Sequence, residues 1–181
     1  MYIFNPGRFL LRSAGNCPTA LKRHYAKIPD NIRNVVSTFR TKQGPVSLKS
    51  LIENKKVIFV GVPGAFTPVC TNQVSEYAEK LGEFKKRGIE SIYVVSVNDH
   101  HVMDAWREML KIGEEITFLA DHSGEFTRAI NQEIDLSAGG LGKRSQRYSL
   151  VVDDGRVVRE HIEVSPGNID VSNASFVLEN L

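Results

Sequence analysis

The sequence predicts an α/β sandwich in which a mixed β-sheet is flanked by helices. Three apolar runs rich in β-branched residues, at 57–62, 89–97 and 116–120, are each followed by a pattern of helical spacing. Alternating strands and helices place successive strands parallel in one sheet. Two later apolar runs are joined by Asp153-Asp-Gly155, a hairpin turn signal that adds an antiparallel pair.

The first part of the domain combines a loop, a short helix and a strand. Prolines and a glycine in residues 26–45 predict a loop with one short strand around Val35–Phe39. Val46–Ile52 carries apolar residues at the spacing of a short helix. Val57–Val62 is apolar on both faces, which is typical of a central buried strand.

Two helices surround the second buried strand, Ile89–Val97. The amphipathic pattern of the first begins near Asn72, and this helix stops near Gly88, which is a natural C-cap residue. Asn98-Asp99 can cap the other helix. Five residues are expected to line one face of that helix: Val102, Ala105, Trp106, Met109 and Leu110.

The last third of the chain supplies the remaining strands. Ile116–Ala120 is the third buried strand, and Asp121 begins a short helix after it. A glycine-rich loop at Ala138–Gly142 precedes the hairpin strands Tyr148–Val152 and Val157–Val164. The last ten residues suit a short terminal helix.

Charge separates the first 25 residues from the rest. Residues 1–25 hold four basic residues and no acidic one, and without them 19 basic residues face 21 acidic ones. The net charge of +2 therefore belongs to the leader, so nucleic-acid binding loses its main support. No apolar run approaches the roughly 18 residues of a membrane span. We expect one domain over residues 26–181.

Residues 1–25 are predicted to be a mitochondrial targeting presequence, because arginines are mixed with bulky apolar residues. The apolar run Phe9–Leu11 is too short for a secretory signal. We expect processing after Arg23–Tyr25, just before Ala26, and a location in the mitochondrial matrix. A disordered basic tail on a cytoplasmic protein is the alternative.

The segment Gly61–Thr71 joins the first buried strand to a helix and places Cys70 in the first helical turn. A free thiol has a pKa of about 8.5, and lowering it to near 6 for fast attack requires about 3.4 kcal/mol. A helix N-terminus supplies roughly 0.3–1 kcal/mol and at most about 2. A reactive thiolate at Cys70 therefore requires a nearby cation. An isolated cysteine at a helix start is more often inert, so the neighbouring residues decide.

Those neighbours form a known pattern. Pro63, Thr67 and Cys70 give the spacing Pro-xxx-Thr-xx-Cys within PGAFTPVCT, which resembles the active-site pattern of the peroxiredoxins. Two later blocks, Ser96–Trp106 and Arg147–Gly155, resemble the type 5 or type II branch. The resemblance runs from about residue 45 to the end. It implies a thioredoxin-like fold and a homodimer formed through the edge that carries the active-site loops.

The resemblance also implies roles for individual residues. Cys70 would attack a peroxide oxygen as the thiolate and become a sulfenic acid. Thr67 would hydrogen-bond the substrate oxygen and the sulfur, while Pro63 would shield the sulfenic acid. Arg147 matches the family arginine that holds the thiolate and polarises the peroxide, which would supply the missing cation. Arg144 is the nearby competitor for that role.

The implied function is a thiol-dependent peroxidase that reduces hydrogen peroxide and alkyl hydroperoxides in antioxidant defence. Such an enzyme uses no cofactor and draws electrons from an external thiol. The alternative is a redox-sensing interaction protein of the same fold, in which oxidation of Cys70 transmits a signal and turnover is slow. A disulfide reductase is disfavoured because the chain has no CxxC pair.

Relatives that resolve the sulfenic acid within one chain carry a second cysteine where this sequence has Val94 or Val171-Ser172. The other cysteine, Cys17, lies in the predicted presequence. We therefore expect a one-cysteine enzyme that is regenerated by glutathione, with glutaredoxin or thioredoxin completing the exchange. A retained leader that forms a Cys17–Cys70 disulfide is the alternative.

Two further motifs are assigned no chemistry. His100-His101 lacks the spacing and partners of a metal site, so no metal is expected. Gly139–Gly142 precedes a strand and not a helix, unlike a phosphate-binding loop. Trp106 and Met109 fit the core-facing side of a helix.

Overall fold

The computed structural model describes residues 27–181. The predicted presequence, its processing point and Cys17 lie outside these residues, so the corresponding expectations stay predictions.

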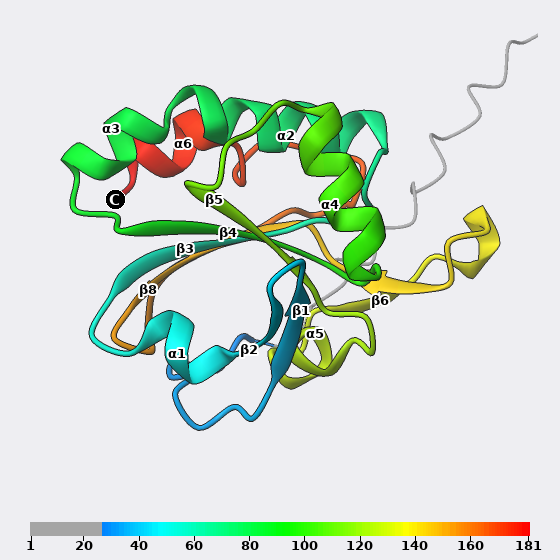
Figure 1. Ribbon diagram of the computed structural model, residues 1–181, viewed down its shortest axis with the longest axis horizontal. Coiled ribbons are helices and arrows are strands. Elements are labelled where there is room, and N and C mark those ends of the chain that lie inside the picture. Colours follow the sequence, from blue (N-terminus) through cyan, green and yellow to red (C-terminus); the bar gives the residue numbers. More distant parts are fainter. Residues whose placement is uncertain (1–26) are drawn as a thin grey trace, which may run out of the picture.

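The described residues form the predicted mixed sheet (Figure 1). Its strand order is β2-β1-β5-β4-β3-β8-β9. The strands are Thr38–Thr41 (β1), Gly44–Ser47 (β2), Lys56–Gly61 (β3), Ser91–Ser96 (β4), Ile116–Ala120 (β5), Tyr148–Asp153 (β8) and Arg156–Ile162 (β9). β3, β4 and β5 are parallel, whereas β8 and β9 are antiparallel to their neighbours. The expected order of parallel units followed by a hairpin is confirmed.

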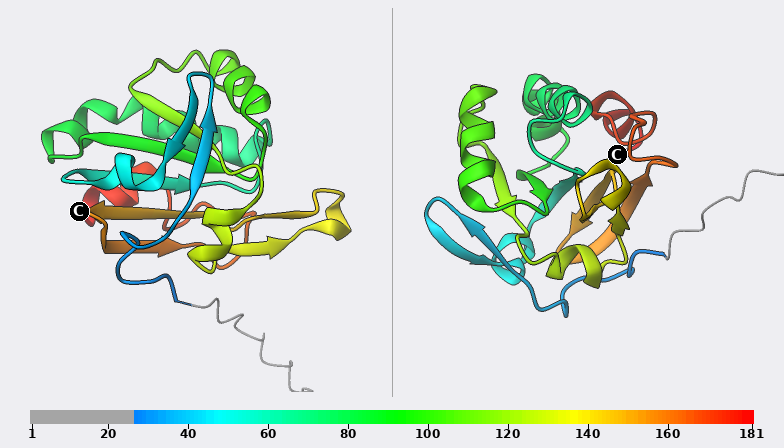
Figure 2. Two further views of the ribbon diagram at one scale, coloured as in Figure 1. Left: turned by 60° about the horizontal axis from the view of Figure 1, so that its bottom comes forward. Right: turned by 90° about the vertical axis from the view of Figure 1, so that its right-hand side faces the viewer.

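Helices cover both faces of this sheet (Figures 1 and 2). One face carries Pro68–Glu79 (α2), Leu81–Lys86 (α3), His100–Met109 (α4) and Ala174–Glu179 (α6). The other face carries Leu48–Ile52 (α1) and Glu125–Ala129 (α5). A small separate hairpin, formed by Glu133–Asp135 (β6) and Lys143–Ser145 (β7), projects from one end of the molecule.

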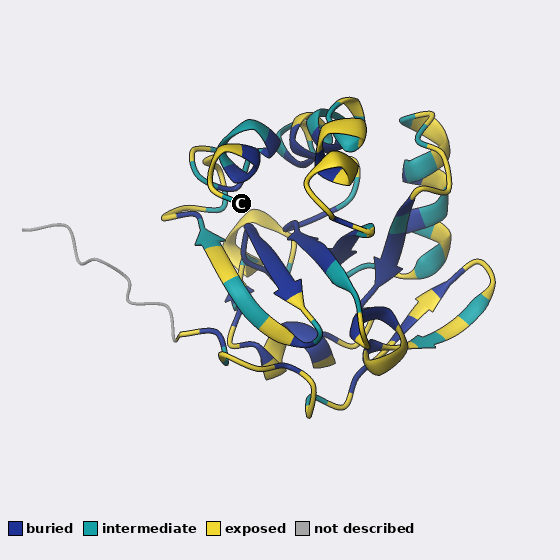
Figure 3. Cartoon of the chain, turned by 90° about the vertical axis from the view of Figure 1, so that its left-hand side faces the viewer, coloured by how far each residue is buried: buried dark blue, intermediate teal, exposed yellow. Residues whose placement is uncertain are grey.

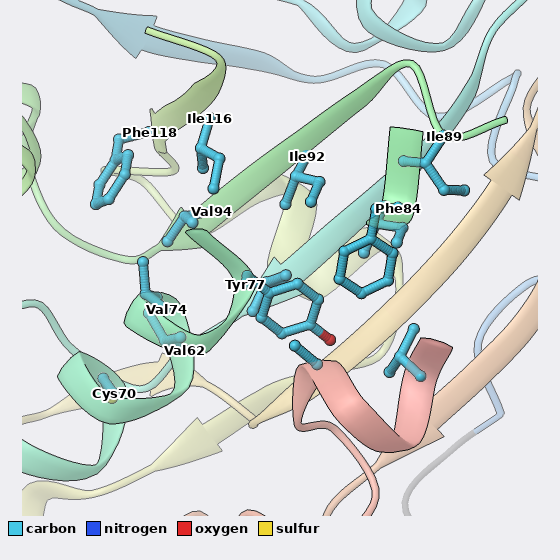
Figure 4. Packing of buried hydrophobic residues seen from close by; sticks show 14 of the residues in the cluster. Val62, Cys70, Val74, Tyr77, Phe84, Ile89, Ile92, Val94, Ile116 and Phe118 are labelled. Carbon is cyan, nitrogen blue, oxygen red and sulfur yellow. The ribbon is translucent and has the colours of Figure 1, made fainter. Parts of the chain in front are cut away.

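The central strands are apolar on both faces because each face has its own core. In β3, Ile58 and Val60 pack in the cluster beneath α2, α3, α4 and α6, while Val57 and Phe59 pack in the cluster beneath α1 and α5. Figure 3 shows the resulting band of buried strands, and Figure 4 shows the first cluster, which includes Cys70. Burial on both sides explains the uninterrupted apolar runs.

Several local expectations were wrong. The short strand expected around Val35–Phe39 lies slightly later in the chain, as β1. It pairs with β2, whose residues were expected to form the end of a loop and the start of a helix. The single helix expected up to Gly88 is divided at Lys80, whose backbone leaves the helical region (φ −94°, ψ 6°). The apolar pattern continues across this break, because Tyr77 and Phe84 stack on each other with ring centroids 5.4 Å apart.

The buried side of α4 also differs from the expected one. Met103 and Trp106 are fully buried, whereas Met109 is 50% exposed and Ala105 lies on the exposed side. Asp99 caps the helix as expected, by accepting a hydrogen bond from the backbone N–H of Val102 at 3.0 Å. Trp106 and Leu110 pack against the core as expected, but Met103, and not Ala105 or Met109, completes the buried side of the helix.

Within residues 27–181, no helix is both long and apolar enough to cross a membrane.

The end of β3 leaves no space for a side chain at position 61. Gly61 pairs with Tyr148 of β8, and a Cβ at this position would overlap the Tyr148 ring. We expect Gly61→Ala to lower the free energy of unfolding by about 1–3 kcal/mol, since overpacking must displace a buried ring. Urea unfolding would measure the change.

Gly82→Ala in α3 is the matched control. A Cβ on Gly82 meets nothing within 4 Å, so this change should stabilise the protein by up to about 1 kcal/mol. Equal stability of Gly61→Ala and the unmodified protein would show that the ring moves aside freely.

Candidate active site

The turn that follows β3 carries Cys70 to the start of α2. Val62 continues the sheet by donating its backbone N–H to the Val95 carbonyl at 3.0 Å. Thr67 is the N-cap residue of α2 and Pro68 occupies the first position, where its missing N–H is harmless. Cys70 is therefore the third residue of the helix, and its side chain is fully buried.

Residues of the next strand hold this turn in place. The Asn98 side-chain oxygen accepts hydrogen bonds from the Ala65 backbone N–H at 3.1 Å and from the Ser96 hydroxyl at 2.7 Å. Because β3 and β4 are parallel, the residues that follow β4 lie beside the residues that follow β3. Phe66 has a positive φ of 63°, which is uncommon for a side chain of this size, and its ring is 47% exposed.

The antiparallel pairing of β3 and β8 brings Arg147 to the same place. Gly61, the last residue of β3, faces Tyr148, the first residue of β8. Arg147 directly precedes Tyr148, so it reaches the turn although 77 residues separate it from Cys70. The Arg147 Nη2 atom lies 3.4 Å from the Cys70 Sγ atom.

The Arg147 guanidinium is buried among neutral acceptors. Its side chain is only 2% exposed. Nε and Nη2 donate to the Pro166 carbonyl at 3.0 and 2.8 Å, and Nη1 donates to Gln73 Oε1 at 2.7 Å. None of the ion pairs within residues 27–181 includes Arg147. The guanidinium is therefore held by neutral oxygens alone, with Nη2 shared between the Pro166 carbonyl and the Cys70 sulfur.

The second arginine points elsewhere. Arg144 donates from Nη1 to the Val97 carbonyl at 3.2 Å and from Nε to the Leu141 carbonyl at 2.7 Å. Its contacts therefore join the β6–β7 hairpin to the end of β4. Of the two arginines considered from the sequence, Arg147 is the one in contact with Cys70.

Thr67 and Pro63 lie in the turn with different surroundings. The Thr67 hydroxyl donates to the Gly64 carbonyl at 3.1 Å, so its proton points back into the turn and not at the sulfur. Its oxygen retains lone pairs that can accept a hydrogen bond from a bound hydroperoxide. Pro63 is buried next to Gly64.

Sequence reasoning missed the side chain that supports Arg147 from the helix. Gln73 is fully buried three residues after Cys70, which places both on one face of α2. Besides accepting from Arg147, it donates to the Ser172 carbonyl at 3.0 Å and to the Ser172 hydroxyl at 2.9 Å. The sequence could have indicated this role, because Gln73 is a polar residue beside the apolar positions Val74 and Tyr77 of the buried helix face. The Pro166 carbonyl gives no such signal, because every residue has one.

The other candidate features are not part of this arrangement. The rings of His100 and His101 lie 4.0 Å apart at the start of α4. The described residues contain no group of three or more histidine, cysteine or acidic side chains that could hold a metal ion. Cys70 is a free thiol.

The arrangement as a whole suits nucleophilic attack by sulfur. The α2 N-terminus contributes roughly 0.3–1 kcal/mol toward a thiolate. The Arg147 guanidinium occupies the place where the sequence requires a cation, 3.4 Å from the sulfur. The same group can also donate to an oxygen that gains charge next to the sulfur.

Comparisons with known proteins agree with this geometry. The family model described as Redoxin matches residues 26–178. Peroxiredoxin-2F, mitochondrial, of Oryza sativa subsp. japonica is 38% identical over 135 residues, which span 74% of this chain and 68% of the rice protein. Peroxiredoxin-2B of Arabidopsis thaliana is 43% identical over 136 residues, which span 75% of this chain and 83% of the relative.

Solved structures show the same similarity. Reduced Prx3 from Vibrio vulnificus, in complex with H2O2, is 35% identical and superposes with a TM-score of 0.76. The match covers 87% of this chain and 97% of the Vibrio chain.

Arg147→Gln tests the contact with sulfur. Glutamine keeps a polar side chain but removes the charge and the donor to Cys70. We expect the second-order rate constant for oxidation by hydrogen peroxide to fall by about 100- to 1000-fold, as for loss of one preorganised donor. Stopped-flow measurement of peroxide consumption provides the rate.

Arg144→Gln is the matched control. Arg144 makes no hydrogen bond to Cys70, so its replacement should change the rate less than about threefold, far less than the loss of a donor at the sulfur. A result in which both variants lose the same activity would mean that general positive charge matters and not the contact at Cys70.

Proposed function

The chain belongs to the peroxiredoxins, in the type II or type 5 branch, and is a thiol-dependent peroxidase; we propose that Cys70 alone carries its peroxide chemistry and that an external thiol completes the cycle. The thioredoxin-like fold expected from the sequence is confirmed by its structural neighbours. One observation carries the proposal: the Arg147 Nη2 atom lies 3.4 Å from the sulfur of Cys70, which is a free thiol.

In the proposed oxidation step, the Cys70 thiolate attacks one oxygen of the hydroperoxide. A sulfur–oxygen bond forms as the oxygen–oxygen bond breaks, and the leaving hydroxide or alkoxide takes up a proton and departs as water or alcohol. The attacked oxygen and one proton remain on sulfur as the sulfenic acid. Arg147 stabilises both the thiolate and the charge that develops on the leaving oxygen. Thr67 orients the hydroperoxide, and Pro63 shields the product.

In the proposed reduction step, the second sulfur comes from outside the domain. Cys70 is the one cysteine within residues 27–181. The family resemblance implies a resolving cysteine at the positions of Val94 or Val171-Ser172 in other members, and this chain has none there. Glutathione condenses with the sulfenic acid and releases water. A second thiol, delivered by glutaredoxin or thioredoxin, then attacks the mixed disulfide and frees the Cys70 thiolate.

This second step requires the site to open. The Cys70 side chain has an exposed fraction of 0%. Hydrogen peroxide is small, but glutathione and a partner protein must bring a sulfur atom into line with the Cys70 sulfur. The first turn of α2, which begins at Pro68, is therefore the segment that must loosen before reduction.

The proposed location is the mitochondrial matrix, with the cytoplasm as the alternative. The support is the composition of residues 1–25 together with the mitochondrial designation of the rice relative. If the leader is removed, Cys17 is lost with it, which leaves the one-cysteine cycle described above.

A homodimer is proposed through the edge that carries the active-site turn. Phe66 is 47% exposed in the turn, and Leu141 is 37% exposed in the neighbouring loop between β6 and β7. Arg144 fixes this loop by donating to the Leu141 carbonyl at 2.7 Å and to the Val97 carbonyl, which follows β4, at 3.2 Å. Large exposed apolar side chains on adjoining segments suit a protein interface.

Reconstituted turnover tests the one-cysteine cycle. The protein of residues 26–181 should consume hydrogen peroxide and tert-butyl hydroperoxide continuously with glutathione and glutaredoxin, and should form a glutathione adduct on Cys70. Cys70→Ser should do neither. Full-rate reduction by thioredoxin without glutathione would exclude the glutathione route.

Native mass spectrometry of the protein purified from mitochondria tests location and assembly together. We expect a subunit that lacks about the first 25 residues, in keeping with the presequence composition, and a complex of twice that mass. Phe66→Ser should weaken the dimer without changing the subunit mass. An intact leader with a Cys17–Cys70 disulfide after peroxide treatment would instead make Cys17 the resolving residue.

A further inference from the structure

One buried carboxylate lies outside the chemistry described so far. Glu163 follows β9 and is only 2% exposed. A single oxygen of this side chain, Oε1, accepts four hydrogen bonds. The donors are the backbone N–H groups of Asp170, Val171 and Ser172, at 2.8, 2.9 and 2.8 Å, and the Ser172 hydroxyl at 2.8 Å.

These bonds close the loop of residues 164–172 upon itself. The loop leaves the sheet at Glu163, whose backbone N–H donates to the Arg147 carbonyl at 3.0 Å. It returns at Ser172, where the Glu163 carboxylate binds three successive N–H groups. Most side chains in between, including Ser165 and Asn168, are exposed. The carboxylate therefore ties together the two ends of a loop that has little packing of its own.

Both supports of the Arg147 guanidinium belong to this loop or depend on it. The Pro166 carbonyl, in the middle of the loop, accepts from Nε and Nη2 of Arg147. Ser172, at the end of the loop, accepts twice from Gln73, which in turn accepts from Nη1 of Arg147. Movement of the loop would release the guanidinium on two sides.

We propose that Glu163 is a positioning residue for peroxide reduction: by fixing the loop of residues 164–172, it holds the Arg147 guanidinium against the Cys70 sulfur. The inference rests on the proposed role of Arg147 and extends it to a side chain that touches neither the sulfur nor the substrate. A purely structural carboxylate would stabilise the fold and leave the reactivity of Cys70 unchanged.

Glu163→Gln tests the inference in the full-length protein, because glutamine keeps the size and one acceptor oxygen but removes the charge. The rate constant for oxidation by hydrogen peroxide should fall by about 10- to 100-fold, as expected when a catalytic group is misplaced by less than about 1 Å. The pH profile of Cys70 alkylation by iodoacetamide should move to higher pH, since a loosely held guanidinium favours the thiolate less.

Three further variants serve as controls for the effect of Glu163→Gln. Glu160→Gln, at an exposed position of β9 three residues before Glu163, should behave as the unmodified protein. Glu163→Asp, which keeps the charge on a shorter side chain, should recover part of the rate. In the Arg147→Gln background, Glu163→Gln should lower the rate less than about twofold, because residues that act as a unit are not additive.

An unchanged rate and pH profile in Glu163→Gln, with fast peroxide reduction by the unmodified protein, would overturn the inference. Slow reduction by the unmodified protein itself would instead refute the proposed function. If Glu163→Gln does not fold, Ser172→Ala removes one donor to Glu163 and one acceptor of Gln73. That variant should shift the rate and the pH profile in the same directions by a smaller amount, and no shift would count against the inference.

Discussion

The active-site turn depends on the buried Arg147 guanidinium, which forms no ion pair with any residue between 27 and 181. Removing a guanidinium from water is costly, and neutral carbonyl and amide oxygens compensate only part of that cost. In this protein Arg147 receives such neutral acceptors from Pro166 and Gln73. The same guanidinium also directs Nη2 at the Cys70 sulfur, 3.4 Å away, so the neutral acceptors that hold the arginine also fix the contact on which the proposed peroxide chemistry rests.

The topology of the sheet makes that contact possible. Parallel strands bring the turn after β3 and the residues after β4 to one edge. The antiparallel strand β8 begins at this edge because Gly61 faces Tyr148. Glycine at position 61 leaves space for the Tyr148 ring against the backbone of β3. Arg147 directly precedes Tyr148, so this packing places the arginine beside the turn. Backbone packing and side-chain chemistry are thus coupled at one residue pair.

The sequence predicts the local elements and, through the family resemblance, the distant Arg147, but it misses contacts made through the backbone or within a loop. The buried strands follow from apolar runs, and Cys70 and Thr67 from a short motif. The hairpins β1–β2 and β6–β7 are short and polar, so their residues carry no strong periodic pattern. Helical spacing locates the apolar face of α4 only approximately, so it selected Met109 where the structure buries Met103. Pro166 acts through its backbone, and Glu163 binds its own loop, so neither residue type indicates its contact.

The only tryptophan of the chain is placed where it can report on the reaction centre. Trp106 is fully buried, donates from Nε1 to the Thr71 hydroxyl at 3.2 Å, and packs near the Phe66 ring with centroids 6.5 Å apart. Thr71 and Phe66 lie on either side of Cys70 in the chain. The loosening of α2 proposed for the reduction step would therefore change the surroundings of a single indole, so tryptophan fluorescence is a direct probe of this turn.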